Sequence, residues 1–185
     1  LVTDAMLWET KADGPVLSVI DDSAMDGSFV SGPVYASDIM DLFKDDLCVV
    51  TVSMTGGAIR TMFEEAIKGY PYAEQFLQLS GGYVSYNTGT AIGSSIDELL
   101  IGSQTPDDAR SYIVAMTDEM AERLGYKQTN MILHQYRTVS AVLKDYLASG
   151  HADEPAASSK DGQGISDSAE NTADTSEKSS RIDIH

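Results

Sequence analysis

Two apolar stripes with the repeat of an α-helix constrain the fold of this chain more than any other feature. The first lies between Thr55 and Gly69 and comprises Ile59, Met62, Phe63, Ala66 and Ile67. The second follows Thr138, ends near Gly150 and comprises Val139, Val142, Leu143, Tyr146 and Leu147. Spacings of three and four residues place such side chains on one helical face. Because threonine favours the start of a helix and glycine its end, both stretches predict helices.

Segments that alternate apolar and polar residues lie between the two predicted helices. In "LCVVTVSM" one apolar face is formed by Cys48, Val50, Val52 and Met54. "FLQLSGGYVSYN" is typical of two strands around Gly81 and Gly82, and "DELLIGSQTPDDARSYIVAM" of another pair, with Pro106 in the turn. "YASDIMDLF" predicts a short helix opened by Ser37. Because helices and strands mix without a strict βαβ repeat, the sequence favours an α+β fold with a mixed β-sheet flanked by helices.

The charge balance excludes one class of partner. The 185 residues include 29 acidic and 12 basic side chains, which gives a formal net charge of −17. Nucleic-acid binding depends on Lys and Arg that neutralise phosphates, so we expect no nucleic-acid partner. The sequence has no stretch of about 18 consecutive apolar residues, so we expect no membrane insertion. Cys48 is the one cysteine and cannot form an internal disulfide.

The composition changes at His151. Residues 151–185 hold 8 acidic and 3 basic residues among Ser and Ala, with little to bury. Ordering them would cost backbone entropy without compensating burial, so we expect a disordered acidic tail or linker. Residues 1–150 keep −12 of the formal charge and are long enough for one domain. The opening "LVTDAMLWET" is typical of the middle of an amphipathic helix, which suggests that an upstream part is absent.

Six blocks of residues 1–150 occur in the order and spacing of one known domain. They are "LVTDAM" at 1–6, "GPVYASDIMDLF" at 32–43, "VVTVSMTGGAIRTMFEEAI" at 49–67, "FLQLSGGYVSY" at 76–86, "SYIVAMTDEMA" at 111–121 and "TVSAVLKDYL" at 138–147. In these blocks the chain resembles the C-terminal domain of the 5'-nucleotidase family, the bacterial nucleotidase and UDP-sugar hydrolase group. The run "FLQLSG" after "MTGGAIRTMFEEAI" is the most specific part of the resemblance.

The resemblance implies that catalysis belongs to another part of the protein. Family members carry an N-terminal metallophosphoesterase domain, which holds two divalent metal ions and performs hydrolysis, while the C-terminal domain grips the nucleoside. Two-metal hydrolysis needs a cluster of Asp, His and Asn ligands. This chain has three histidines, two of them in the expected tail. We therefore expect no catalytic residue and no cofactor in this chain, and as its partner an upstream metallophosphoesterase domain of the same polypeptide.

Three aspartates, Asp21, Asp22 and Asp26, stand where the resemblance implies a nucleoside-binding loop. The family loop reads Asn-Gly-Gly-Gly-Ile-Arg before a Gly-Pro pair. Counting back from Gly32-Pro33 places Asp21 at the asparagine and Asp26 at the arginine. A carboxylate thus replaces a guanidinium, which would bind a ligand with a bidentate fork.

The resemblance also implies two aromatic rings that stack on the base. The first belongs to a Pro-Phe-Gly turn, where spacing places Asp45, with Phe43 two residues early. The second belongs to a run that here reads "TDEMAERLGY", with Glu119 at the aromatic position and Tyr126 at the end. Stacking contributes about 1–3 kcal/mol per base, so we expect loops without these rings to bind a nucleoside much more weakly. The candidate substrate-binding residues are Asp21, Asp26, Phe43, Asp45, Glu119 and Tyr126.

Other interpretations of these residues stay open. The aspartates are alternatively solvated loop carboxylates, a Ca²⁺ or Mg²⁺ site, or a remodelled pocket for a cationic or polar small molecule. Their spacing matches no calcium-loop motif. His134 is expected to be a half-buried strand residue rather than a ligand. Trp8 and Tyr126 are expected in the core or at its rim unless they line a pocket.

Two functions remain open for the parent protein. In the first, it is a metal-dependent phosphoester hydrolase, and this chain is its recognition domain, inactive alone. In the second, the chain is a non-enzymatic extracellular binding or interaction module. An intact set of Asp, His and Asn metal ligands upstream would separate the two. The resemblance implies an extracytoplasmic location, at the cell surface or secreted.

Overall fold

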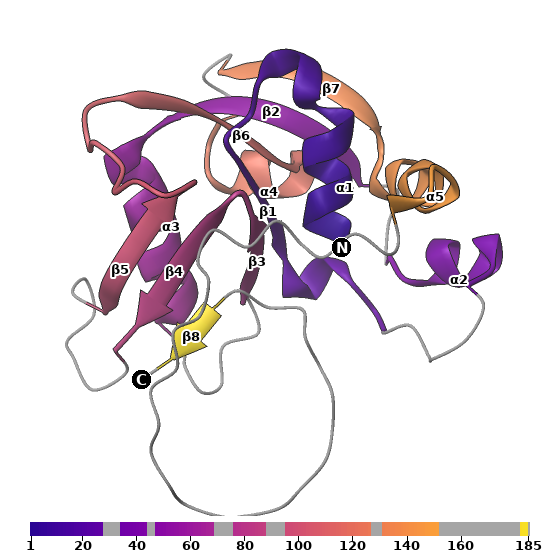
Figure 1. The fold of residues 1–185 in the computed structure, drawn as a ribbon, viewed down its shortest axis with the longest axis horizontal. Helices are drawn as coiled ribbons and strands as arrows, with labels where there is room; N and C mark the ends of the chain where they lie inside the picture. Colours follow the sequence, from indigo (N-terminus) through magenta and orange to yellow (C-terminus); the bar gives the residue numbers. More distant parts are fainter. Residues whose placement is uncertain are drawn as a thin grey trace, which may run out of the picture.

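Two β-sheets with helices against them make up the part of the chain that the structure describes (Figure 1). The structure is a computed structural model, and it describes residues 1–27, 34–43, 47–68, 76–87, 95–126 and 131–151 and the strand at 182–184. The helices are α1 (Val2–Glu9), α2 (Ala36–Asp41), α3 (Gly56–Ile67), α4 (Asp118–Arg123) and α5 (Val139–Ala148), with 3-10 turns η1 (Lys11–Asp13) and η2 (Asp22–Ala24). The strands are β1 (Leu17–Asp21), β2 (Cys48–Thr55), β3 (Leu77–Ser80), β4 (Gly82–Tyr86), β5 (Ile96–Ile101), β6 (Ser111–Thr117), β7 (Ile132–Thr138) and β8 (Ile182–Ile184).

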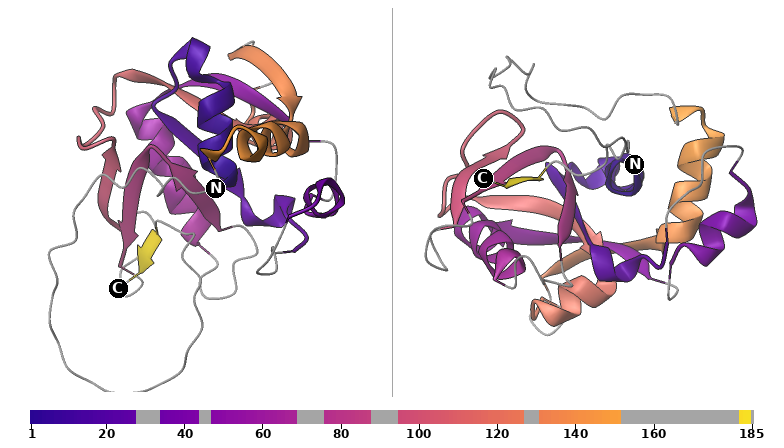
Figure 2. Two further views of the ribbon diagram at one scale, coloured as in Figure 1. Left: turned by 45° about the vertical axis from the view of Figure 1, so that its right-hand side comes forward. Right: turned by 90° about the horizontal axis from the view of Figure 1, so that it is seen from below.

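The large sheet is mixed. Its strand order is β3-β1-β6-β2-β7, in which β1 and β6 run parallel and the other neighbours antiparallel. The small sheet has the order β5-β4-β8. Figure 2 shows α3, in magenta, and α5, in orange, lying apart from each other in both views. The predicted α+β fold with a mixed sheet flanked by helices is confirmed.

Three strands pass directly into helices through a threonine. Thr55, Thr117 and Thr138 each end a strand, and each side-chain oxygen accepts a hydrogen bond from the backbone three residues on. This bond satisfies one of the backbone N–H groups that a helix start leaves without an intrahelical partner. The two helices predicted from their apolar stripes are confirmed as α3 and α5. The predicted end of the first at Gly69 lies outside the described residues.

The centre of the large sheet is covered on both faces, and two apolar cores lie against it. On one face Val50, Val52 and Met54 of β2 pack with α3, α4 and the small sheet. On the other face Val49 packs with residues of α1, α2 and α5. The predicted apolar face of β2 is confirmed for Val50, Val52 and Met54, while Cys48 is half-buried. The strand runs between the two cores.

Gly81 marks the corner at which the chain leaves one sheet for the other. The two strands predicted around Gly81 and Gly82 both form, but β3 belongs to the large sheet and β4 to the small one. Gly81 has a φ of 86°, and a Cβ there would lie 2.4 Å from the carbonyl oxygen of Val16. Glycine is thus required by backbone conformation and by space. The pair predicted around Pro106, β5 and β6, is likewise divided between the sheets.

One local prediction is wrong. α2 begins after Tyr35, whose N–H donates to Oδ2 of Asp38 at 2.8 Å, so Ser37 does not open the helix. Near the end of the sequence, Ile182–Ile184 form β8 beside β4. Residues 152–181 and 185 lie outside the described residues, and the division at residue 150 stays a prediction.

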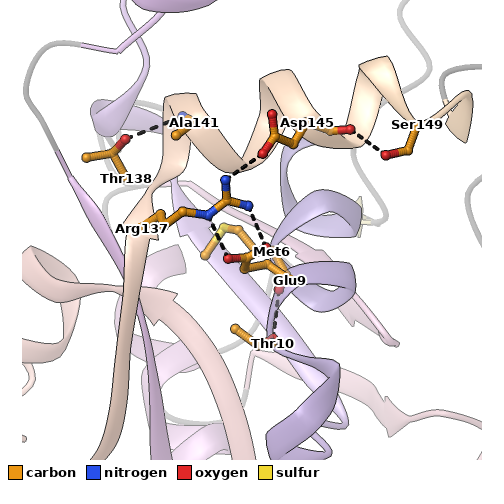
Figure 3. A network of polar contacts seen from close by, with 8 residues as sticks. All are labelled: Met6, Glu9, Thr10, Arg137, Thr138, Ala141, Asp145 and Ser149. Carbon is orange, nitrogen blue, oxygen red and sulfur yellow. Dashed lines mark hydrogen bonds and ion pairs between the residues drawn. The ribbon is translucent and has the colours of Figure 1, made fainter.

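A guanidinium ties β7 to two helices (Figure 3). Nε and Nη2 of Arg137 donate to the two carboxylate oxygens of Glu9 on α1, at 3.0 and 2.9 Å. Nη1 donates to Oδ2 of Asp145 on α5 at 2.5 Å. Bidentate pairing of this kind fixes orientation as well as distance. The network therefore links α1 and α5 to the edge strand of the sheet.

Asp13 of η1 makes a second polar link to the sheet. Its carboxylate accepts from Oγ1 of the buried Thr51 at 2.5 Å and lies 2.6 Å from Nδ1 of His134 on β7. His134 is 65% exposed, so the prediction of a half-buried histidine is wrong. Burial by itself would raise the pKa of Asp13, but its hydrogen bonds with Thr51, Tyr136 and His134 hold that pKa below the ordinary 3.8.

We expect the Asp13 link to make stability fall in acid. A carboxyl whose pKa is lower in the folded state stabilises the fold above its unfolded pKa, and this contribution disappears as the pH falls through the folded pKa. The difference in unfolding free energy between the wild type and Asp13→Asn should therefore shrink as the pH falls from about 5 to about 2. Urea denaturation across that range measures it. A constant difference, like that expected for the exposed control Asp97→Asn, would contradict the assignment.

We expect Gly81→Ala to destabilise the fold far more than Gly102→Ala. Both glycines have positive φ, but a Cβ at Gly102 would meet nothing within 4 Å. Gly102→Ala should therefore cost only the backbone strain, about 1–2 kcal/mol. Gly81→Ala adds the collision with Val16 and should cost about 3 kcal/mol or more. Chemical denaturation of both variants tests the difference, and equal losses would show that the corner is not close-packed.

Candidate functional site

Asp21 ends a buried strand and anchors the candidate site. β1 pairs with β6 at its start and with β3 as far as Asp21, which lies opposite Leu77, and only 4% of the Asp21 side chain is exposed. Its Oδ1 accepts the N–H of Ser23 at 2.9 Å and so shapes the turn η2. The next residue, Asp22, is exposed; its N–H donates to the carbonyl of Phe76 and its carboxylate accepts from Gln78.

Arg123 at the end of α4 pairs with Asp21. Its Nη2 lies 2.5 Å from Oδ2 of Asp21, and the guanidinium is 38% exposed. The two residues are 102 positions apart in the sequence. The charge of the buried carboxylate is thereby compensated, which a buried charge requires. Sequence reasoning missed Arg123; the available signal was an aspartate at the end of a buried strand, which needs a cationic partner.

The backbone brings Asp26 and Phe43 together. Met25 and Phe43 form an isolated antiparallel bridge, and the N–H of Asp26 donates to the carbonyl of Leu42 at 2.7 Å. The Asp26 side chain is exposed. Phe43 is 8% exposed and packs in the core beneath α2 and α5, so its ring offers little free face.

Glu119 and Tyr126 lie on the same segment as Arg123. Glu119 is exposed in the first turn of α4, four residues before Arg123. Tyr126 follows the positive-φ Gly125 and packs, half-buried, against the larger core. Burial raises the pKa of the Tyr126 phenol. Of these three side chains, Arg123 is the one that contacts β1, through Asp21, while Asp45 lies outside the described residues.

The described residues form neither a metal-ligand cluster nor a membrane-spanning helix. Among the described residues, no group of three or more His, Cys, Asp and Glu side chains is arranged to hold a metal ion. No helix in the described ranges is long and apolar enough to cross a bilayer. Trp8 contacts Tyr146 edge-on, with ring centroids 5.9 Å apart, and is partly buried at the second core, as expected for a rim residue.

Several solved structures share this fold. The 5'-nucleotidase precursor from Thermus thermophilus aligns over 99% of this chain and 34% of its own, with a TM-score of 0.73 and 17% identity. NAD nucleotidase from Haemophilus influenzae aligns over 99% and 32%, with a TM-score of 0.70 and 14% identity. A putative 5'-nucleotidase from Staphylococcus aureus in complex with α-ketoglutarate aligns over 99% and 35%, with a TM-score of 0.69 and 11% identity. The chain thus spans about a third of the length of these proteins.

Sequence comparison gives the family directly. No curated protein matches the chain in sequence. The family model described as "5'-nucleotidase, C-terminal domain" matches residues 1–129, which hold the elements from α1 to α4 and so most of the larger core. The chain therefore belongs to the 5'-nucleotidase family, and residues 1–129 match the C-terminal domain of that family.

Proposed function

We propose that this chain is the recognition domain of a metal-dependent phosphoester hydrolase and is inactive alone. The family match over residues 1–129 supports this proposal, as does a length about one third of that of the similar nucleotidases. Hydrolysis would belong to an upstream metallophosphoesterase domain of the same polypeptide, which would hold the divalent metal ions. The extracytoplasmic location that the resemblance implies is part of the same proposal.

We further propose that the nucleoside-binding loops have diverged in this member, and the Asp21–Arg123 ion pair is the observation that carries this step. A guanidinium recognises a phosphate or a carboxylate best when its N–H fork faces the ligand. In this structure one arm of the Arg123 fork is engaged by a buried carboxylate, which cancels its charge locally. At the position where the resemblance implies an arginine, Asp26 presents an exposed carboxylate instead.

The two positions at which the resemblance implies stacking rings also support the proposed divergence of the nucleoside-binding loops. Phe43, the aromatic residue nearest the first stacking position, is packed in the core. At the second position stands the exposed carboxylate of Glu119. Each missing stack removes about 1–3 kcal/mol of base binding. A small molecule suited to these loops would be polar or cationic rather than a nucleoside monophosphate.

We expect adenosine, AMP and UDP-glucose to bind this chain with a Kd above about 1 mM. We also expect that the chain releases no phosphate from AMP in the presence of Mg²⁺ or Mn²⁺. Asp26→Arg, which restores a guanidinium at the loop, should tighten AMP binding about tenfold. Asp97→Arg makes the same charge change on β5 and serves as the matched control. Isothermal titration calorimetry and a phosphate assay give the two readouts.

Two outcomes would overturn these proposals separately. Micromolar binding of a nucleotide by the unchanged chain, lost in Asp45→Ala or Glu119→Ala, would show that the loops have kept their grip. Phosphate release by the chain itself would show that it is not a recognition domain alone.

We expect Arg123→Met to lower the free energy of unfolding by about 1–3 kcal/mol, because it leaves the Asp21 carboxylate buried without its cation. The partial exposure of Arg123 keeps the effect below that of a fully buried pair. Combining it with Asp21→Asn should recover part of the loss, since no charge then remains to compensate. Lys144→Met on the exposed side of α5 is the control. Strict additivity in this double-mutant cycle would show that the pair does not interact in solution.

A further inference from the structure

β4 has a partner on each edge, and the second partner comes from the far end of the chain. β5 pairs with β4 antiparallel, with Val84 opposite Leu99. β8 pairs with it in parallel, with Val84 opposite Ile182, Ser85 opposite Asp183 and Tyr86 opposite Ile184. Figure 1 shows β8, in yellow, lying beside β4. The second edge of β4 is thus formed with a segment about 100 positions later in the sequence.

The sequence of β4 lacks the usual protection of a free edge. Natural edge strands carry charges or proline, which discourage pairing with another strand. β4 reads "GYVSY" and contains neither. By contrast, β5 carries Asp97 and Glu98, and β7 carries Arg137. The composition of β4 is that of a strand paired on both sides.

The small sheet also needs a third strand. A two-stranded ribbon is marginal in water, whereas three strands with an apolar face are stable. Val84 and Tyr86 are buried in the larger core, so the position of β4 affects the packing beneath it. Every N–H and C=O on its second edge would lack a strand partner without β8.

We infer that the second edge of β4 is an acceptor site for a parallel, extended peptide segment of the pattern aliphatic–polar–aliphatic, and that the chain's own Ile182–Ile184 occupies it intramolecularly. Addition of a strand to a sheet edge is a recurrent mode of peptide recognition. Because the segment belongs to the same chain, it is present at a high effective concentration, and the entropy cost of bringing it to β4 grows only slowly with the length of the intervening sequence. An external peptide must therefore displace β8 before it can bind.

Hydrogen exchange on the full chain tests the occupied edge. Asp183→Pro removes the N–H of the middle residue of β8 and disfavours its pairing. Exchange at Val84–Tyr86 should become at least about tenfold faster, whereas exchange in β1 should not change. Ser168→Pro introduces the same residue into the segment before β8 and should leave Val84–Tyr86 unchanged. Equal exchange in the wild type and Asp183→Pro would overturn the inference.

Peptide binding tests the acceptor site itself. A fluorescent peptide of residues 179–185, "SSRIDIH", should bind the Asp183→Pro chain at least about tenfold more tightly than the wild type, and a scrambled peptide should bind neither. If Asp183→Pro also accelerates exchange in β1, the milder Ile184→Asn replaces it in both experiments. Failure of the peptide to bind the opened chain would contradict the acceptor site. A wild-type dimer that dissociates in Ile184→Asn, seen by light scattering, would show that a second copy supplies the strand.

Discussion

Burial of the centre of the large sheet on both faces is the constraint on which the rest of the structure depends. β1 and β2 send side chains into two separate cores, and the neighbouring β6 adds Val114 and Met116 to the larger one. Each face needs its own cover, which α3, α4 and the small sheet provide on one side and α1, α2 and α5 on the other. Three strands pass directly into helices that cover the sheet. In each case one threonine ends the strand and caps the helix that follows.

The same constraint explains the candidate site. Asp21 ends the buried strand β1, and its carboxylate, only 4% exposed, must be compensated. Arg123 supplies the charge from α4, so one arm of its guanidinium is held by the protein itself. The proposed divergence of the nucleoside-binding loops rests on this pairing as well as on the residues at the positions where the resemblance implies an arginine and two rings.

The sequence allowed much of the fold and part of the site to be predicted. The helices at Thr55 and Thr138 were predictable because stripe and cap both lie within about a dozen neighbouring residues. Asp21 and Asp26 were singled out by their distance from Gly32-Pro33. Arg123 was not, since nothing local marks an exposed-helix arginine as the partner of a distant aspartate. The exposure of His134 was missed for a related reason: β7 lies at an edge of the sheet, and strand order is not a local property.

The sequence by itself determined the helices α3 and α5 with their threonine caps, the strands around Gly81 and Gly82, and which family pattern the chain follows. These properties depend on side-chain spacing and backbone preferences over a few residues. Only the tertiary structure decided that β3 and β4 belong to different sheets, that Asp21 is neutralised by Arg123, and that the end of the chain pairs with β4. Those outcomes depend on burial and on hydrogen bonds between segments far apart in the chain, whose energies exist only once the sheets have formed.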